Sequence, residues 1–151
     1  MPIAGPMRRC AILLSTFAFF LGGCSGGDEA RLQSEIDSLL PDGAKQTGEC
    51  NWASGFIEDA AASLACSYLV NGELGSVATA ARTKLRARGY ALRVVHLPRD
   101  APLEWLVSGQ QRDYQASVGL VAPGHPLDWQ RNWLPVPPGK VGVYVQVAER
   151  Q

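Results

Sequence analysis

Hydrophobic positions follow two different rhythms along this chain, which predicts a mixture of helices and strands. Leu32, Ile36, Leu39 and Leu40 recur at helical spacing until Pro41, so residues 28–40 are expected to form an amphipathic helix. A second helix is predicted where apolar residues again recur every three or four positions, at Leu74, Val77, Ala78, Ala81 and Leu85. Gly89 follows it, as is common after a helix C-terminus.

Other stretches alternate apolar and polar residues, which is typical of half-buried strands. The clearest is Val141, Val143, Val145 and Val147. Weaker alternation predicts strands within residues 62–70 and 90–96 and a hairpin of residues 103–108 and 112–121, and a weak signal in residues 44–52 permits a strand. The intervening stretch 122–140 holds five of the ten prolines and is predicted to be irregular.

These elements predict an α+β fold, with an antiparallel or mixed sheet of five or six short strands and one or two helices packed on one face. The general architecture is similar to that of ferredoxin-like sandwiches, and this similarity carries no functional meaning. Residues 28–151 are enough for one domain with its own core, and too few for two.

The N-terminus has the three parts of a signal peptide, which are a basic start at Arg8-Arg9, an apolar run from Cys10 to Phe20, and small residues at its end. The apolar stretch is shorter than the roughly 20 residues that a membrane-spanning helix needs. Its last residues, Leu21-Gly22-Gly23-Cys24, resemble the lipobox of bacterial lipoproteins. The resemblance covers only about the first 25 residues.

The lipobox resemblance implies that residues 1–23 are removed as a signal peptide and that Cys24 is lipidated and usually N-acylated. Two acyl chains suffice for stable anchoring to a lipid bilayer. Residues 24–27 would then be the lipidated cysteine and a flexible tether, with residues 28–151 as a periplasmic domain. Because Ser25, rather than aspartate, follows the cysteine, the resemblance favours the outer membrane over the inner membrane.

Charge and cysteine content change this picture in two ways. Removal of residues 1–23 takes away two of the 14 basic residues and none of the 14 acidic ones, so the mature chain has a net charge of −2, which does not indicate a nucleic-acid partner. Cys50 and Cys66 are the two cysteines after Cys24, and an oxidising compartment predicts a disulfide between them. A zinc site would need about four suitably spaced ligands, so no metal and no cofactor is expected.

The sequence gives only weak signals for catalytic residues. His96 could act as a base assisted by Asp100 or Glu104, and His125 could be oriented by Asp128, but a hydrogen-bonded structural histidine is the commoner outcome. No serine or cysteine has the sequence setting of a nucleophile. We therefore expect a protein that is not an enzyme and has no catalytic residues.

Two other groups of residues could contact a partner. Trp129 and Trp133 lie in the proline-rich stretch, where their indoles either complete the core or form an aromatic surface for partner binding. The second predicted helix carries four basic residues, either as a solvated face or as contacts to anionic lipid head groups: Arg82, Lys84, Arg86 and Arg88.

The sequence thus predicts a membrane-anchored envelope lipoprotein, whose small non-catalytic domain binds a protein partner or a cell-wall component. An inhibitor or immunity-type lipoprotein that blocks an enzyme is the alternative, and an envelope hydrolase is a third possibility with less support.

Overall fold

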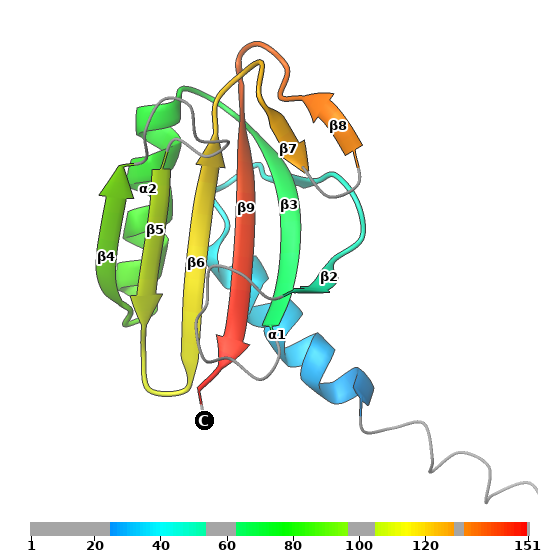
Figure 1. Cartoon of the computed structure of the whole chain (residues 1–151). Helices are drawn as coiled ribbons and strands as arrows, with labels where there is room; N and C mark the ends of the chain where they lie inside the picture. The colour runs from blue at the N-terminus through cyan, green and yellow to red at the C-terminus, as the bar shows by residue number, and fades with distance from the viewer. Residues whose placement is uncertain (1–24, 54–62, 97–104, 129–131, 151) are drawn as a thin grey trace, which may run out of the picture.

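The computed structural model describes residues 25–53, 63–96, 105–128 and 132–150. The predicted signal peptide, Cys24 and Trp129 lie outside these ranges. Along the chain the elements are α1 (Ser25–Leu39), β1 (Lys45–Gln46), β2 (Asn51–Ala53), β3 (Ser63–Asn71), α2 (Leu74–Ala87), β4 (Ala91–His96), β5 (Trp105–Gln110), β6 (Tyr114–Val121), β7 (Pro126–Asp128), β8 (Asn132–Pro135) and β9 (Lys140–Glu149). Figure 1 shows their arrangement.

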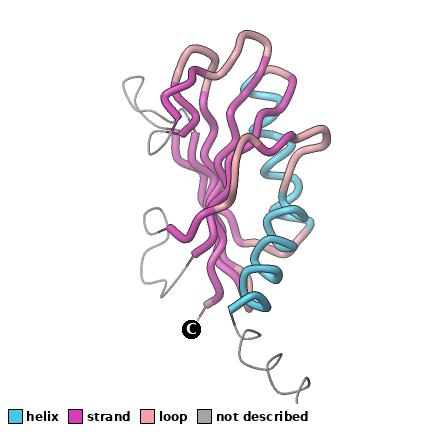
Figure 2. Tube along the Cα trace, turned by 90° about the vertical axis from the view of Figure 1, so that its right-hand side faces the viewer, coloured by secondary structure: helices cyan, strands magenta, loops and turns pink. Residues whose placement is uncertain are grey.

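The main sheet is antiparallel and has the strand order β1-β3-β9-β6-β5-β4, with β2 also paired to β3. Both helices pack on the same face of this sheet (Figure 2). Helix α1 lies against β3 and β9, whereas α2 lies against β4, β5 and β6. The predicted α+β class, with helices on one face of a sheet, is therefore confirmed.

The alternating valines of β9 form the middle of the core. Val143, Val145 and Val147 are fully buried between the sheet and the helices, because β9 lies between β3 and β6. Helix α1 contributes Ile36 and Leu39, and α2 contributes residues that include Leu85, all of them fully buried. The apolar stripe predicted for each helix is thus the stripe that packs on the sheet.

The helix boundaries depart from the prediction at the N-terminus of α1. The helix begins at Ser25, so it includes the small residues 25–27 for which a flexible tether was expected. It ends at Leu39, just before Pro41 and the left-handed Gly43 (φ +78°). Pro41 cannot continue the helical hydrogen bonding, and glycine adopts positive φ without strain.

The prediction for residues 122–140 was wrong, because this stretch contains a second, two-stranded sheet formed by β7 and β8. Leu127 and Val136 from this small hairpin are buried against Val121, with Leu69 packed beside them. They cover one end of the sheet face that the helices leave open. Gly142 of β9 lies beneath them, where a Cβ would come within 2.6 Å of Leu127 and 2.8 Å of Val136.

The ferredoxin-like arrangement and the number of strands are not confirmed. A ferredoxin-like domain repeats a strand-helix-strand unit. Here only α2 connects two strands of the main sheet, β3 and β4, and three strands lie between them in the sheet. The other helix, α1, instead precedes all the strands.

Candidate functional site

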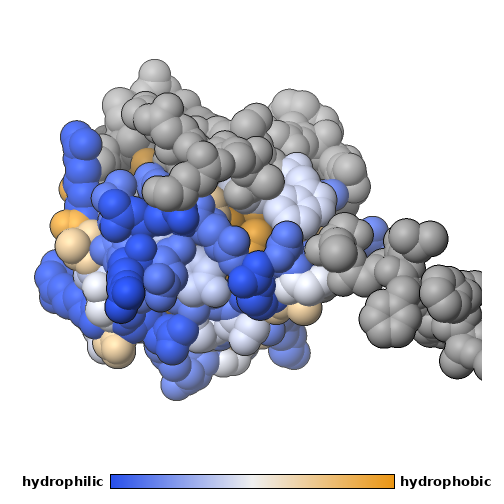
Figure 3. Space-filling view, turned by 90° about the horizontal axis from the view of Figure 1, so that it is seen from below, coloured by the Kyte–Doolittle hydropathy of each residue, from blue (hydrophilic) through white to orange (hydrophobic). Residues whose placement is uncertain are grey.

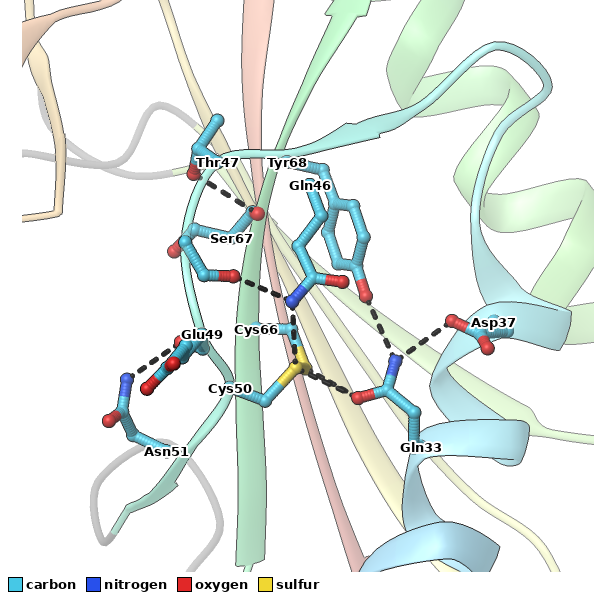
Figure 4. The surroundings of a disulfide bond; sticks show 11 residues. Gln33, Asp37, Gln46, Thr47, Glu49, Cys50, Asn51, Cys66, Ser67 and Tyr68 are labelled. Atoms are coloured by element: carbon cyan, nitrogen blue, oxygen red, sulfur yellow. Dashed lines mark hydrogen bonds between the residues drawn. A yellow bond between two sulfur atoms is a disulfide. The ribbon is translucent and has the colours of Figure 1, made fainter.

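The predicted disulfide between Cys50 and Cys66 is present, with a Cα–Cα distance of 4.4 Å. It attaches the segment between β1 and β2 to the central part of β3 (Figure 4). On the helix side, Oε1 of Gln33 lies 2.9 Å from the Cys50 sulfur, and Nε2 of Gln33 donates to Asp37 at 2.9 Å. The disulfide is therefore partly shielded by α1, and it holds together strands too short to be stable alone.

A buried carboxylate joins three distant parts of the chain. Glu35 of α1 is 4% exposed and accepts hydrogen bonds from Arg88 at 2.5 Å, from the hydroxyl of Tyr90 at 2.9 Å and from Nε2 of Gln111 at 3.2 Å. Arg88 follows α2, Tyr90 precedes β4, and Gln111 follows β5. Because an uncompensated buried charge is strongly destabilising, these donors make Glu35 a link between α1 and the rest of the domain.

The environment of Tyr90 resists ionisation. Burial raises the pKa of Tyr90 well above its ordinary value, and the neighbouring Glu35 carboxylate raises the pKa further, because a phenolate beside it would be a second negative charge. Burial also raises the pKa of Tyr68, next to Gln33. Both hydroxyls are thus held in the protonated form at neutral pH, which suits a structural hydrogen bond rather than proton transfer.

A row of mostly polar residues crosses the sheet on its outer face, which we define as the face opposite the helices. Consecutive register partners across β4, β5, β6, β9, β3 and β2 are Arg93, Ser108, Ser117, Gln146, Ala65 and Asn51. Ser117 and Gln146 are each 1% exposed. Nε2 of Gln146 donates to Ser63 at 2.6 Å, whereas the Ser117 hydroxyl has no hydrogen-bond partner.

The four basic residues of the α2 region divide into two pairs. Lys84 bonds to Asp42 in the turn after α1 at 3.0 Å, and Arg88 bonds to Glu35 of α1, so both point toward α1 and its C-terminal turn. No ion pair among the described residues includes Arg82 or Arg86. The four residues therefore do not form one continuous basic face, because two of the charges serve contacts inside the domain.

The structure does not assemble the other residues that the sequence singled out. His125 is exposed in the turn before β7, and His96 and Asp128 end β4 and β7, respectively. Asp100 and Glu104 lie outside the described residues. Trp133 belongs to β8 by its backbone, and Trp129 lies outside the described residues, so the partner-binding role of these tryptophans stays a hypothesis.

Sequence reasoning missed Glu35, although its position carried a signal. Glu35 lies three residues after Leu32 and four before Leu39, which places it on the apolar side of α1. A carboxylate on such a stripe needs partners from elsewhere in the fold. Nothing in the sequence identified Arg88, Tyr90 and Gln111 as those partners.

The described residues contain no group of three or more histidine, cysteine, aspartate or glutamate side chains placed to hold a metal ion. Within the same residues, no helix is both long and apolar enough to cross a membrane. No protein-family model, no curated protein and no solved structure matches this chain.

Proposed function

We propose that this protein is a bacterial envelope lipoprotein, cut before Cys24 and held at the outer membrane by lipid on that cysteine. Its domain binds a protein partner or a cell-wall component and carries out no chemistry of its own. The non-catalytic part of the proposal is supported by the buried carboxylate of Glu35, whose three hydrogen bonds join α1 to other elements and so have a structural role.

The observation that carries the proposal is the disulfide between Cys50 and Cys66. Disulfides persist in secreted and periplasmic proteins and are rare in the cytosol. The bond uses both cysteines that follow Cys24, and Cys10 belongs to the predicted signal peptide. Cys24 is thus the one cysteine of the mature chain without a partner in the domain, as a lipidated residue requires.

The position of α1 agrees with an anchor immediately before it. The helix begins at Ser25 and leaves the domain at the lower right of Figure 1, near the end of the molecule that also holds the C-terminus. Seen from below, this end is largely hydrophilic (Figure 3). It includes Arg31, which is paired with Asp28 and Glu149, and the exposed Arg112. Such a surface suits the aqueous layer next to lipid head groups rather than the bilayer interior.

The anchor is tested by replacing Cys24 with alanine in the full-length chain expressed in a bacterium. We expect Cys24→Ala to abolish labelling by a radioactive fatty acid and to leave the precursor uncut, because the lipid-modified sulfur would be absent. The matched control is Cys10→Ala, which removes a cysteine of the predicted signal peptide and should be labelled and cut normally. Normal processing and membrane retention of Cys24→Ala would overturn the proposal.

The binding role is tested by cross-linking the lipidated protein in intact cells and identifying what it captures. Recovery of an envelope assembly protein or of cell-wall fragments supports the proposal. Recovery of a lytic enzyme whose activity falls in the complex would replace it with the inhibitor class. The variant Trp129→Ala with Trp133→Ala, measured alongside, reports whether the two tryptophans contribute to capture.

A further inference from the structure

Strand β4 leaves one edge of the main sheet open. Within the described residues it pairs with β5 alone, so its other side presents unpaired backbone N–H and C=O groups. Val94 in this strand is 37% exposed and is one of two large hydrophobic residues exposed in the described part of the domain. An exposed strand edge with an apolar side chain is a ready site for an added strand from a partner.

The basic residues of α2 that lack an ion pair lie on the flank of the helix next to this edge. Successive helix residues are rotated by about 100°, so Arg82 and Arg86 each lie roughly 200° around the axis from Lys84. Lys84 faces α1, which lies over β3 and β9. Arg82 and Arg86 therefore lie on the opposite flank of α2, away from α1. In Figure 1, β4 is on the side of α2 away from α1, so this is the flank next to β4.

Two further observations on the described residues concern cations beside this edge. Nε of Arg82 is buried and has no hydrogen-bond partner in the part of the chain that the structure describes, although leaving such a donor unpaired is costly. Arg93 of β4 is exposed on the outer face of the sheet, and it also takes part in no ion pair among the described residues. The edge thus has cations on both faces, and no carboxylate among the described residues is bound to Arg82, Arg86 or Arg93.

We propose that the β4 edge binds an extended acidic segment of a protein partner, which adds to the sheet as a strand beside β4. Its backbone continues the hydrogen-bonding ladder, an apolar side chain covers Val94, and carboxylates on the same side reach Arg82 and Arg86. This inference rests on the proposed protein-binding function and specifies the surface and the chemistry of the partner.

The geometry favours a protein segment over a membrane surface. Helix α1 begins at the lower right of Figure 1, whereas β4 forms the left-hand edge of the sheet, at the far side of the domain from the proposed anchor. Lipid head groups could neutralise the arginines, but they could not complete the backbone hydrogen bonds of β4. An added acidic strand would satisfy both the arginine charges and the backbone hydrogen bonds of β4.

The test uses the purified full-length chain in detergent and a fluorescent ten-residue peptide in which glutamate alternates with valine and threonine. Binding is measured by fluorescence anisotropy, and backbone protection in β4 is measured by hydrogen exchange. We expect the acidic peptide to bind and to slow exchange in β4, and a peptide with lysine in place of glutamate not to bind. Because an exposed ion pair contributes up to ~1 kcal/mol, Arg82→Gln with Arg86→Gln should weaken binding about five- to thirty-fold.

Matched variants keep the result interpretable. Lys45→Glu with Lys140→Glu reverses two charges elsewhere and should leave peptide affinity within about twofold, since exposed charges beyond the Debye length are screened. Arg86→Glu alone, at an exposed position, should still weaken binding if Arg82→Gln with Arg86→Gln unfolds the domain. The inference is overturned by equal binding of acidic and basic peptides, by binding without β4 protection, or by binding to vesicles of anionic lipid but not to the peptide. If the acidic peptide does not bind at β4 but capture of a partner in cells still depends on Cys24, the proposed function stands and only the inference about β4 is wrong.

Discussion

Two serines on the outer face of the sheet have similar burial but different hydrogen bonding. Ser63 is 2% exposed and accepts a hydrogen bond from Gln146, whereas Ser117 is 1% exposed and its hydroxyl has no partner. A buried hydroxyl without a partner loses its hydrogen bonds to water and gains nothing in return. The two residues should therefore respond in opposite ways to the same substitution.

We predict that Ser117→Ala raises the free energy of unfolding by up to about 1 kcal/mol, because it removes an unsatisfied polar group. Ser63→Ala should lower it by about 1–3 kcal/mol, because the amide of buried Gln146 loses an acceptor. Urea denaturation of the two variants and the unmodified protein checks both signs. A loss of stability in Ser117→Ala as large as in Ser63→Ala would show that the Ser117 hydroxyl has a partner after all.

At the scale of elements, the β7–β8 hairpin depends on a glycine in a different strand. Leu127 and Val136 approach the backbone of β9 closely because Gly142 has no side chain there. Leu127 can rotate away from an added methyl group, but the β-branched Val136 has little freedom to do so. The position of the hairpin on the sheet therefore depends on the absence of a side chain at Gly142.

Gly142→Ala should lower the free energy of unfolding by about 1–3 kcal/mol through overpacking. The matched control is Gly75→Ala in the first turn of α2, where a Cβ would meet nothing within 4 Å. There the better helix propensity of alanine should leave stability unchanged or raise it by up to about 1 kcal/mol. Thermal melting of both variants distinguishes these outcomes, and equal melting temperatures would contradict the role given to Gly142.

The elements that sequence could predict are those with a long periodic pattern. Residues 74–87 and 140–149 show four or more regularly spaced apolar residues, so α2 and β9 were found close to their true limits. Strands β1, β2 and β7 have only two or three residues each, too few for alternation to be visible. The disulfide and the small cluster around Leu127 hold them in place, and such long-range contacts leave no local signal.

At the scale of the whole molecule, two buried tyrosines make stability sensitive to alkaline pH. The pKa of Tyr90 and of Tyr68 is raised in the folded protein, mainly by burial. Below pH 10 both states keep the protons and stability is unaffected. As the pH rises above about 10, the unfolded chain releases protons that the folded chain retains, so the free energy of unfolding falls by up to about 1.4 kcal/mol per pH unit for each tyrosine until the pH reaches its folded-state pKa.

Urea denaturation at pH 9, 10 and 11 measures this slope. The variant Tyr68→Phe with Tyr90→Phe serves as the control, because it keeps the aromatic rings and removes both titrating groups. At pH 9 we expect this variant to be less stable than the unmodified protein, because the substitution removes the hydrogen bond from Tyr90 to Glu35. Between pH 10 and 11 it should lose less stability than the unmodified protein. Parallel curves for the two proteins would mean that neither tyrosine has the raised pKa.

If the protein is anchored through Cys24 as proposed, the hydrogen bonds of Glu35 have a mechanical consequence. A load applied just before Ser25 pulls on α1, whose apolar residues and Glu35 connect it to the sheet, to the end of α2 and to the turn between β5 and β6. Force on the proposed anchor would thus be shared among three parts of the chain rather than carried by the helix alone. Under tension, α1 should therefore not detach from the sheet before the rest of the domain, and the domain should unfold cooperatively.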